Sequence, residues 1–264
     1  MQSAEVIRSI LAGVIAGLAA GFLGVSPGGI LVPVISFLLP YSQHVVQGIS
    51  LLAQAPPTSA SGLRAYSRGR GKVAWNSVLF VSAGFIAGGP IGAVAAKICT
   101  ERALRWMFVG YLLILMTLAV LKKSNATNVH SEPQDLRRSP FVILIAIGII
   151  AGISSGLLGI GGGLAITSLS VVLLGKNQHE AQALSLAITA LPLTLPAAWV
   201  YVRQGWNLPW LLIGCLVAGL VLGTWTGAGF ANRLNEKTLK SAFVILLATM
   251  AAFMAVIASR SQTP

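Results

Sequence analysis

The chain repeats itself at a constant offset of 135 residues, and this duplication constrains its fold more than any other feature. The glycine-rich segment 21–29 returns at 156–163. The register then holds without an insertion as far as Phe108 and its counterpart Phe243. We therefore expect two copies of one unit, each with a glycine-rich break inside an apolar run. In a membrane protein, equivalent interrupted segments in two halves point to a binding site where the halves meet.

Composition identifies the class of protein. Of the 264 residues, 55% are hydrophobic and only 9% are charged, whereas soluble domains carry about 25% charged residues. A helix needs about 20 apolar residues to cross the ~30 Å hydrocarbon core of a bilayer. Stretches of about this length lie at 10–25, 45–63, 74–96, 103–121, 140–158, 181–202, 208–231 and 239–258. The sequence therefore predicts an all-α polytopic membrane protein with eight to ten helices that span the bilayer or half of it.

The net charge of +12 raises the question of a nucleic-acid partner. The basic residues, however, fall in short loops between apolar stretches, and such clusters are retained on the cytoplasmic side of membrane proteins. The main clusters are Arg64, Arg68, Arg70 and Lys72; Lys122 and Lys123; Arg137 and Arg138; and Arg233, Lys237 and Lys240. We interpret this charge as a topology signal, and we predict a lipid bilayer and no nucleic acid around the chain.

The longest polar stretch, residues 122–139, divides the chain into two halves. We expect residues 1–121 to form the first membrane repeat, residues 140–264 the second, and the stretch between them a cytoplasmic linker. Within each half we predict five helical elements, the third of which is interrupted by proline in the first half. Their ranges are about 5–24, 30–40, 44–66, 74–97 and 102–121, and then 141–159, 164–175, 179–202, 208–232 and 238–258.

The second element of each half is short, because about 11 residues span only roughly 16 Å. If it is a tilted span that borrows flanking residues, each half has five crossings and the repeats are inverted. If it is a half-helix of a re-entrant pair, each half has four crossings and the repeats are parallel. The loop charges do not decide, since the two models place 12 and 11 of the 18 Lys and Arg residues inside. We favour the inverted 5+5 arrangement, because it brings the equivalent breaks together near the midplane from opposite sides.

The two breaks have the chemistry of an anion site. Consecutive glycines form a helix poorly, so we expect one helix to stop and another to start at about Gly28 and Gly163. A helix N-terminus carries unpaired N–H groups and about half a positive charge, and glycine lets a ligand approach that backbone. The candidate residues are Gly24, Ser26, Pro27, Gly28 and Gly29, and in the second half Gly159, Gly161, Gly162 and Gly163.

The alternative role for glycine is close helix packing, which small residues favour in membranes. We prefer that interpretation for the glycines spaced by four, since such a spacing leaves a helix intact. They are Gly84, Gly88 and Gly92, and Gly219, Gly223 and Gly227.

The third element of each half supplies polar side chains spaced three and four apart, which share one helix face. They are Gln47, Ser50 and Gln54 in the first half and Gln182, Ser185 and Thr189 in the second. Amides and hydroxyls can donate hydrogen bonds to an anion without the desolvation cost of a buried charge. Hydrogen bonding between helices explains them equally well.

Two histidines, His44 and His179, begin these same elements. They either cap a loop at the interface or carry a proton, since histidine titrates near neutral pH. Tyr66 with Arg68, and Tyr201 with Arg203, fall at a helix end and are interpreted as interfacial anchors, as are Trp75 and Trp210.

Several function classes are disfavoured. All six acidic residues lie at predicted helix ends or in loops, so the sequence offers no carboxylate proton relay or cation site within a span. It contains no metal-ligand cluster, no cofactor motif and no nucleotide-binding loop. We therefore expect neither an enzyme nor a bound metal or cofactor.

Two halves that each open with a helix ending in a G-x-(G/S)-(G/P)-G break resemble the TauE/SafE family of membrane anion exporters, also called the toluene-sulfonate uptake permease family. Gly21 to Pro33 and Gly156 to Ser168 carry the resemblance, which extends over about residues 8–258. It implies secondary transport of sulfite, sulfoacetate or another sulfur-containing anion, usually as export, in the bacterial cytoplasmic (inner) membrane.

The first break departs from the glycine-rich form, because Ser26-Pro27 stands where the second half has Gly161-Gly162. The two half-sites are therefore expected to be chemically unequal. The competing hypotheses are a channel-like anion pore, proton-coupled uptake of the same anions, and a membrane scaffold that transports nothing. Oligomeric state stays open, with a homodimer as one option.

Overall fold

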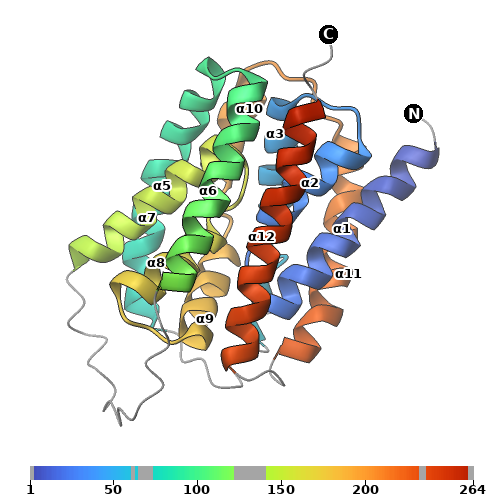
Figure 1. Ribbon diagram of the computed structural model, residues 1–264. Helices are drawn as coiled ribbons and strands as arrows, with labels where there is room; N and C mark the ends of the chain where they lie inside the picture. The colour runs from blue at the N-terminus through green and yellow to red at the C-terminus, as the bar shows by residue number, and fades with distance from the viewer. Residues whose placement is uncertain (1–2, 61–62, 65–73, 122–140, 232–235, 261–264) are drawn as a thin grey trace.

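The computed structural model describes residues 3–60, 63–64, 74–121, 141–231 and 236–260 (Figure 1). These residues form eleven α-helices and no strand. The helices of the first half are α1 (Ser3–Leu23), α2 (Gly28–Leu38), α3 (Gln43–Ala53), α5 (Trp75–Ile98) and α6 (Glu101–Leu121). Those of the second are α7 (Phe141–Leu158), α8 (Gly163–Leu173), α9 (Gln178–Thr189), α10 (Leu195–Arg203), α11 (Trp210–Ala231) and α12 (Glu236–Arg260). The predicted linker 122–139 and the pair Tyr66 and Arg68 lie outside the described residues.

Helix bounds confirm most of the predicted elements and keep the register of the repeat. The short second elements are α2 and α8, each of 11 residues. The third element of the second half was predicted over 179–202, and the structure divides it into two helices, α9 and α10. Pro192 has no N–H to donate, and a residue before proline is disfavoured in the α conformation, so the chain turns between them. In the first half, α3 likewise ends before Pro56.

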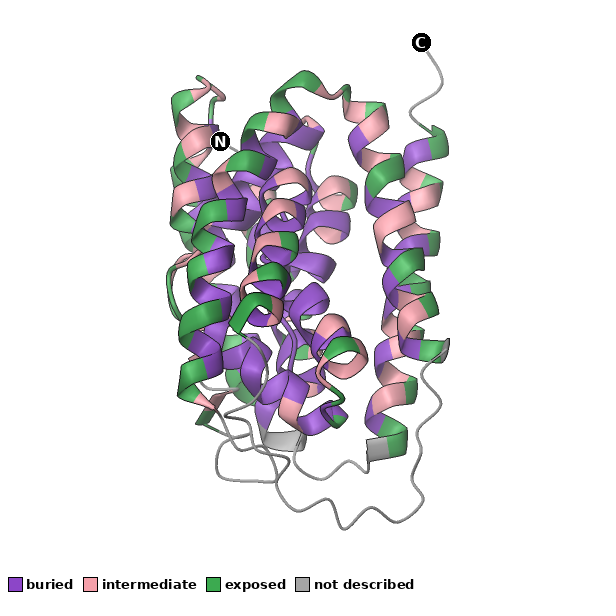
Figure 2. Ribbon diagram, turned by 90° about the vertical axis from the view of Figure 1, so that its left-hand side faces the viewer, coloured by how far each residue is buried: buried purple, intermediate pink, exposed green. Residues whose placement is uncertain are grey.

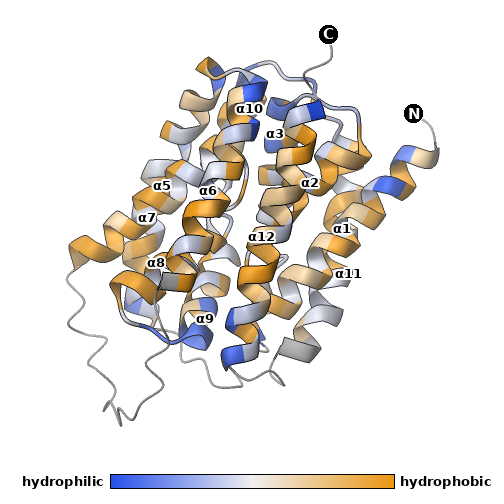
Figure 3. Ribbon diagram, in the orientation of Figure 1, coloured by the Kyte–Doolittle hydropathy of each residue, from blue (hydrophilic) through white to orange (hydrophobic). Residues whose placement is uncertain are grey.

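Six of the described helices are long and apolar enough to cross a membrane, namely α1, α5, α6, α7, α11 and α12. Figure 3 shows hydrophobic residues along the middle of the molecule and hydrophilic residues toward its two ends. The protein is therefore an integral membrane protein with an all-helical fold.

The two halves interlock through the most extensive helix–helix contacts of the molecule. Helix α1 of the first half packs along α11 of the second, and α7 of the second half packs along α5 of the first. The repeat relates these two pairs to each other. The first helix of each half thus packs mainly against a helix of the other half. The hydropathy pattern did not indicate this exchange.

Glycine stripes make these contacts close. A Cβ on Gly13 would lie 3.1 Å from the Cα of Gly219, and one on Gly17 would lie 3.1 Å from the Cα of Gly223. On α5, a Cβ on Gly84 would lie 3.1 Å from the Cα of Gly148. The packing role expected for the glycines of α5 and α11 is therefore confirmed. Along α1 and α11 the residue numbers of the contacting glycines increase together, and the same holds for α5 and α7. The paired helices therefore run parallel.

The short repeat-related helices lie at opposite ends of the molecule. Figure 1 shows α2 and α3 toward one end and their counterparts α8 and α9 toward the other. Helices α6 and α12, which are also repeat-related, pack against each other. This arrangement brings the end of α1 and the end of α7, where the breaks begin, into the interior.

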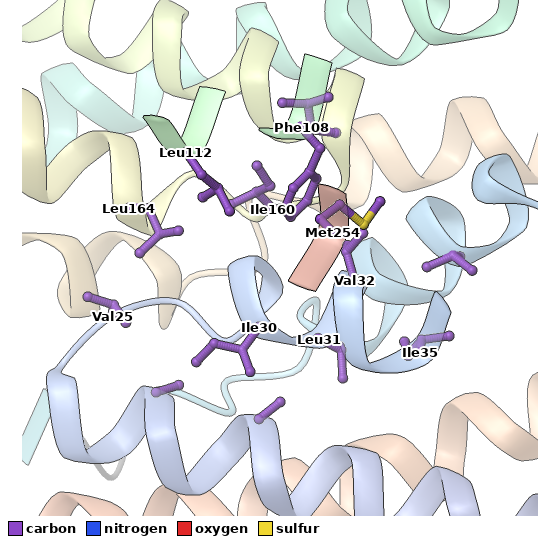
Figure 4. Packing of buried hydrophobic residues seen from close by; sticks show 14 of the residues in the cluster. Val25, Ile30, Leu31, Val32, Ile35, Phe108, Leu112, Ile160, Leu164 and Met254 are labelled. Atoms are coloured by element: carbon purple, nitrogen blue, oxygen red, sulfur yellow. The ribbon is translucent and has the colours of Figure 1, made fainter. Parts of the chain in front are cut away.

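Buried residues fill the space between the helices, and exposed residues lie on the outward faces (Figure 2). The largest apolar cluster includes Ile160, which belongs to the second break and is fully buried. Figure 4 shows Ile160 close to Phe108, Leu112 and Met254, which come from α6 and α12. Its counterpart Val25 belongs to the same cluster. Each break is therefore held in place by one apolar side chain packed into the core.

Candidate functional site

The two breaks reach similar positions through different backbone conformations. Gly24 and its counterpart Gly159 both have positive φ, 64° and 73°. In the second break Gly161 and Gly162 also have positive φ, both 76°, which side chains with a Cβ rarely adopt. In the first break Pro27 precedes α2 with an ordinary φ of −67°. The second break thus depends on backbone conformations that glycine adopts easily. The first break depends instead on the restricted φ of proline.

The breaks meet each other in the interior. A Cβ on Gly28 would overlap the carbonyl of Ile160, and one on Gly163 would overlap the side chain of Ser26. A Cβ on Gly29 would overlap Leu164 of α8. Glycine at these positions is what allows the N-termini of α2 and α8 to approach. The structure therefore brings Ser26, Gly28, Gly161 and Gly163 to one place, whereas Gly162 faces Phe85 of α5.

The side-chain amide of Gln54 connects the two breaks, and both its oxygen and its nitrogen have hydrogen-bond partners. Its Oε1 accepts hydrogen bonds from the Ser26 hydroxyl at 2.6 Å and from the Gly28 N–H at 3.2 Å. Its Nε2 donates to the Ser50 carbonyl at 2.9 Å and lies 3.4 Å from the Gly159 carbonyl. The Ser50 hydroxyl also donates to the Gly159 carbonyl, at 2.7 Å. Two residues of the predicted first-half stripe thus contact the break of the second half.

A small pocket lies at this junction, with a cavity volume of about 10 Å³, roughly the room for one water molecule. Its wall consists of Ser26, Pro27, Gln54, Thr58, Ser59, Gly161, Thr189 and Thr194. Three repeat-related pairs occur in this set: Ser26 with Gly161, Gln54 with Thr189, and Ser59 with Thr194. The pocket therefore lies between the halves, and its wall residues are all uncharged.

Two hydroxyls in this wall have no hydrogen-bond partner. They belong to Thr58 and Thr194, whose side chains are only 3% and 6% exposed. A buried polar group without a partner costs about 1–3 kcal/mol. Such groups are explained when a ligand or water completes them. Thr58 is held from outside the pocket, because the Thr224 hydroxyl of α11 lies 2.8 Å from its carbonyl.

The polar stripe of the second half bonds mainly within its own half. The Ser185 hydroxyl donates to the Gly163 carbonyl at 3.0 Å, and the Thr189 hydroxyl donates to the Ser185 carbonyl at 2.9 Å. Gln182 is fully buried, and neither of its amide atoms has a hydrogen-bond partner. It is not among the residues that line the pocket.

Tyr201 differs from its sequence prediction. An interfacial anchor would be exposed, but Tyr201 is fully buried, and its hydroxyl lies 2.9 Å from both Gln47 Oε1 and the Gly156 carbonyl. One hydroxyl has one proton, so turning the Gln47 amide would let Nε2 donate to the tyrosine oxygen while the tyrosine donates to Gly156. Arg203, in contrast, is exposed, as expected of an anchor, and its Cζ lies 5.3 Å from the centroid of the Trp199 ring.

The two histidines stand apart from the pocket wall. His44 is buried in the first turn of α3, with Nε2 3.1 Å from the Ala96 carbonyl and its ring stacked on Trp206 at 4.8 Å. His179 is buried in the first turn of α9. Neither of the two His44 contacts involves the breaks.

Sequence reasoning did not assign Tyr201, Thr194 or Thr224 to this region. Thr194 could have been found, since it is the counterpart of Ser59, which follows the proline break of the first half. Tyr201 had no such signal, because an aromatic residue next to an arginine at a helix end has the pattern of an anchor.

Known proteins are similar to this chain over almost its whole length. A family model described as Sulfite exporter TauE/SafE matches residues 9–254. The probable membrane transporter protein YdhB of Bacillus subtilis is 28% identical over 87% of this chain and 91% of its own length. A second, YunE of the same organism, is 26% identical over 90% and 93%. One from Haemophilus influenzae is 24% identical over 93% and 96%. No solved structure matches.

Proposed function

Because the chain belongs to the TauE/SafE family of membrane transporters, we propose that it is a secondary transporter that exports a small sulfur-containing anion across the bacterial inner membrane. Sulfite, sulfoacetate and related organosulfonates are the candidates. The anion is held in the pocket between the two breaks, against the N-terminus of α2 and next to that of α8.

One observation carries this proposal: the pocket is walled by both halves and contains two buried hydroxyls without partners. A cation site would offer carboxylates or converging carbonyls, whereas this wall offers hydroxyls, an amide and the start of a helix. These groups can donate to an oxyanion, and the helix dipole favours its charge. The uncharged wall also suits a transporter, which must release its substrate.

We infer that the halves are inverted 5+5 repeats. The opposite placement of α2–α3 and α8–α9 supports this (Figure 1), whereas the parallel packing of α1 with α11 and of α5 with α7 fits either arrangement. In this arrangement α2 and the segment before it complete one crossing, and α3 begins the next. Two broken helices then present their N-termini to one site near the midplane, as in other transporters with inverted repeats.

Export is the downhill direction for an anion. A membrane potential that is negative inside drives an anion outward by about 2.3 kcal/mol per charge per 100 mV. Efflux therefore needs no coupled ion. Uptake would need one, and His44 and His179 are the residues that we would test for a proton role.

Flux through the purified protein tests the proposal. Proteoliposomes loaded with labelled sulfite should release it faster than protein-free vesicles, and a negative internal potential should increase the rate. No release above that of protein-free vesicles at any potential would overturn the proposal. Large steady currents in a planar bilayer would instead identify a pore.

A matched pair of variants ties the flux to the pocket. Gly163→Ala places a Cβ against Ser26, where the breaks meet, and should abolish sulfite release. Gly214→Ala on α11 adds a Cβ where no atom lies within 4 Å and should leave release unchanged. Equal release by both variants would separate transport from the breaks, as the scaffold hypothesis expects.

A further inference from the structure

Gln54 occupies the position at the start of α2 where an anion oxygen would bind. The two groups that donate to its Oε1 are a helix-terminal N–H, that of Gly28, and the hydroxyl of Ser26. The amide orientation is fixed at both ends, because a backbone N–H only donates and the carbonyls of Ser50 and Gly159 only accept. The electronegative atom at the α2 N-terminus is therefore the oxygen of a side chain.

A substrate oxygen has an advantage over this amide oxygen. Hydrogen bonds to an ionised acceptor are about twice as strong as those to a neutral one, and the helix terminus also attracts the full charge of an anion. The same pocket contains the unpartnered hydroxyls of Thr58 and Thr194. An oxyanion has several oxygens, so it can use these hydroxyls and the α2 terminus together, which Gln54 cannot.

We propose that Gln54 is a displaceable internal ligand: its carboxamide oxygen fills the anion position at the α2 N-terminus and is exchanged for a substrate oxygen during binding. This inference rests on the function proposed above and names the residue that sets the affinity of that site. When substrate leaves, Gln54 returns and keeps the helix terminus satisfied. The empty site is thereby stabilised, and substrate is bound only as tightly as the exchange allows.

The second half has no equivalent side chain in that role. The counterpart of Gln54 is Thr189, whose hydroxyl donates to the Ser185 carbonyl. Among the described residues, no side chain accepts a hydrogen bond from the first N–H groups of α8, and the first backbone bond there runs from Ile166 N to the Gly162 carbonyl at 3.0 Å. The displaceable ligand is thus a property of the first half-site alone.

Removing the internal ligand should tighten binding, whereas removing a direct substrate ligand would weaken it. We would measure sulfite, sulfate and thiosulfate binding to purified protein in detergent by calorimetry, without oxygen. Gln54→Ala should lower the Kd of the best-bound anion at least threefold. Gln54→Thr, which copies the second half, should act in the same direction and provides a second variant if the alanine protein does not fold.

Gln43→Ala is the matched control, because it truncates another buried glutamine, at the first residue of α3, about 16 Å along the helix axis from Gln54, which caps the other end. Its Kd should stay within twofold of the wild type. An unchanged or raised Kd in Gln54→Ala and Gln54→Thr, in a protein that still exports sulfite, would overturn this inference alone. If the wild type neither binds nor transports any of the three anions, the proposed function fails and this inference fails with it.

Discussion

The two breaks occupy equivalent places but are stabilised by different means. The second break depends on three glycines with positive φ, at 159, 161 and 162. The first has one such glycine and relies on Pro27 and on the hydrogen bond from Ser26 to Gln54. A duplicated unit can therefore keep its geometry while its chemistry diverges. The first half-site contributes side-chain groups, and the second offers mainly backbone.

The largest expected effect comes from adding a Cβ to the second break. In Gly161→Ala the Cβ would overlap Gln54 Oε1 and lie 2.7 Å from the Ser26 hydroxyl, in a left-handed conformation. The conformation costs about 1–2 kcal/mol and the overlap adds about 1–3 kcal/mol. Thermal or denaturant unfolding in detergent should show a loss of roughly 2–5 kcal/mol.

Gly175→Ala separates the two contributions. Gly175 also has positive φ, 68°, but a Cβ there would have no atom within 4 Å. Its loss should be only the conformational part, about 1–2 kcal/mol. If both variants unfold alike, the second break does not depend on contact with the first.

The next effect concerns the tyrosine that holds the second break. Tyr201→Phe removes a buried hydroxyl shared by Gln47 and the Gly156 carbonyl, and leaving such groups unpaired costs about 1–3 kcal/mol. The melting temperature should fall, and sulfite release should slow because Gly156 precedes the break. Tyr41→Phe near the start of α3, with no side-chain hydrogen bond among the described contacts, should change neither. Unaltered stability in Tyr201→Phe would show that the tyrosine hydroxyl does not stabilise the second break.

A smaller loss is expected in the first break. Ser26→Ala keeps the Cβ and removes one donor to Gln54, while Gly28 still donates to the same oxygen. The free energy of unfolding should fall by about 1 kcal/mol. The exposed Ser259→Ala on α12 should stay within about 0.5 kcal/mol of the wild type. A loss in Ser26→Ala as large as that in Gly161→Ala would contradict the division of roles between the breaks.

The smallest loss of stability should come from the two unpartnered hydroxyls. Thr58→Val and Thr194→Val keep the shape of the side chain and break no hydrogen bond. They also remove a buried group whose unpaired state costs about 1–3 kcal/mol, so the free energy of unfolding should not fall and should rise by up to that amount. Sulfite binding should nevertheless weaken about tenfold in each, the value of roughly one hydrogen bond to a charged group. Unchanged binding in both would show that these hydroxyls do not face the anion.

The sequence allowed the elements to be predicted because each depends on local chemistry. Apolar length marks the long helices, and glycine or proline marks where the short ones stop, so the bounds of α2 and α8 were close to expectation. The interlocked pairing was not predicted, because every long helix is apolar and hydropathy does not choose partners. A signal was present in the glycines of α1, Gly13, Gly17 and Gly21, which have the same spacing as those of α11.

The site was predicted in outline for a similar reason. The breaks could be located from glycine and proline, but the role of each polar side chain depends on how the halves dock. Ser50 and Gln54 contact the break of the other half, while Ser185 bonds within its own, although both triplets have the same spacing. Such differences arise from tertiary contacts, which a repeat in the sequence does not contain.

The interlocking has a consequence for synthesis of the chain. Helix α1 is made first, but the helix against which its glycine stripe packs, α11, follows roughly 200 residues later, about 10–40 s at usual rates of synthesis. During this interval the Gly13 face of α1 is exposed to lipid or to whatever assists insertion. Only near its C-terminal end does the nascent chain carry the surface that completes its beginning, so a truncated product lacks the partner of its own first helix.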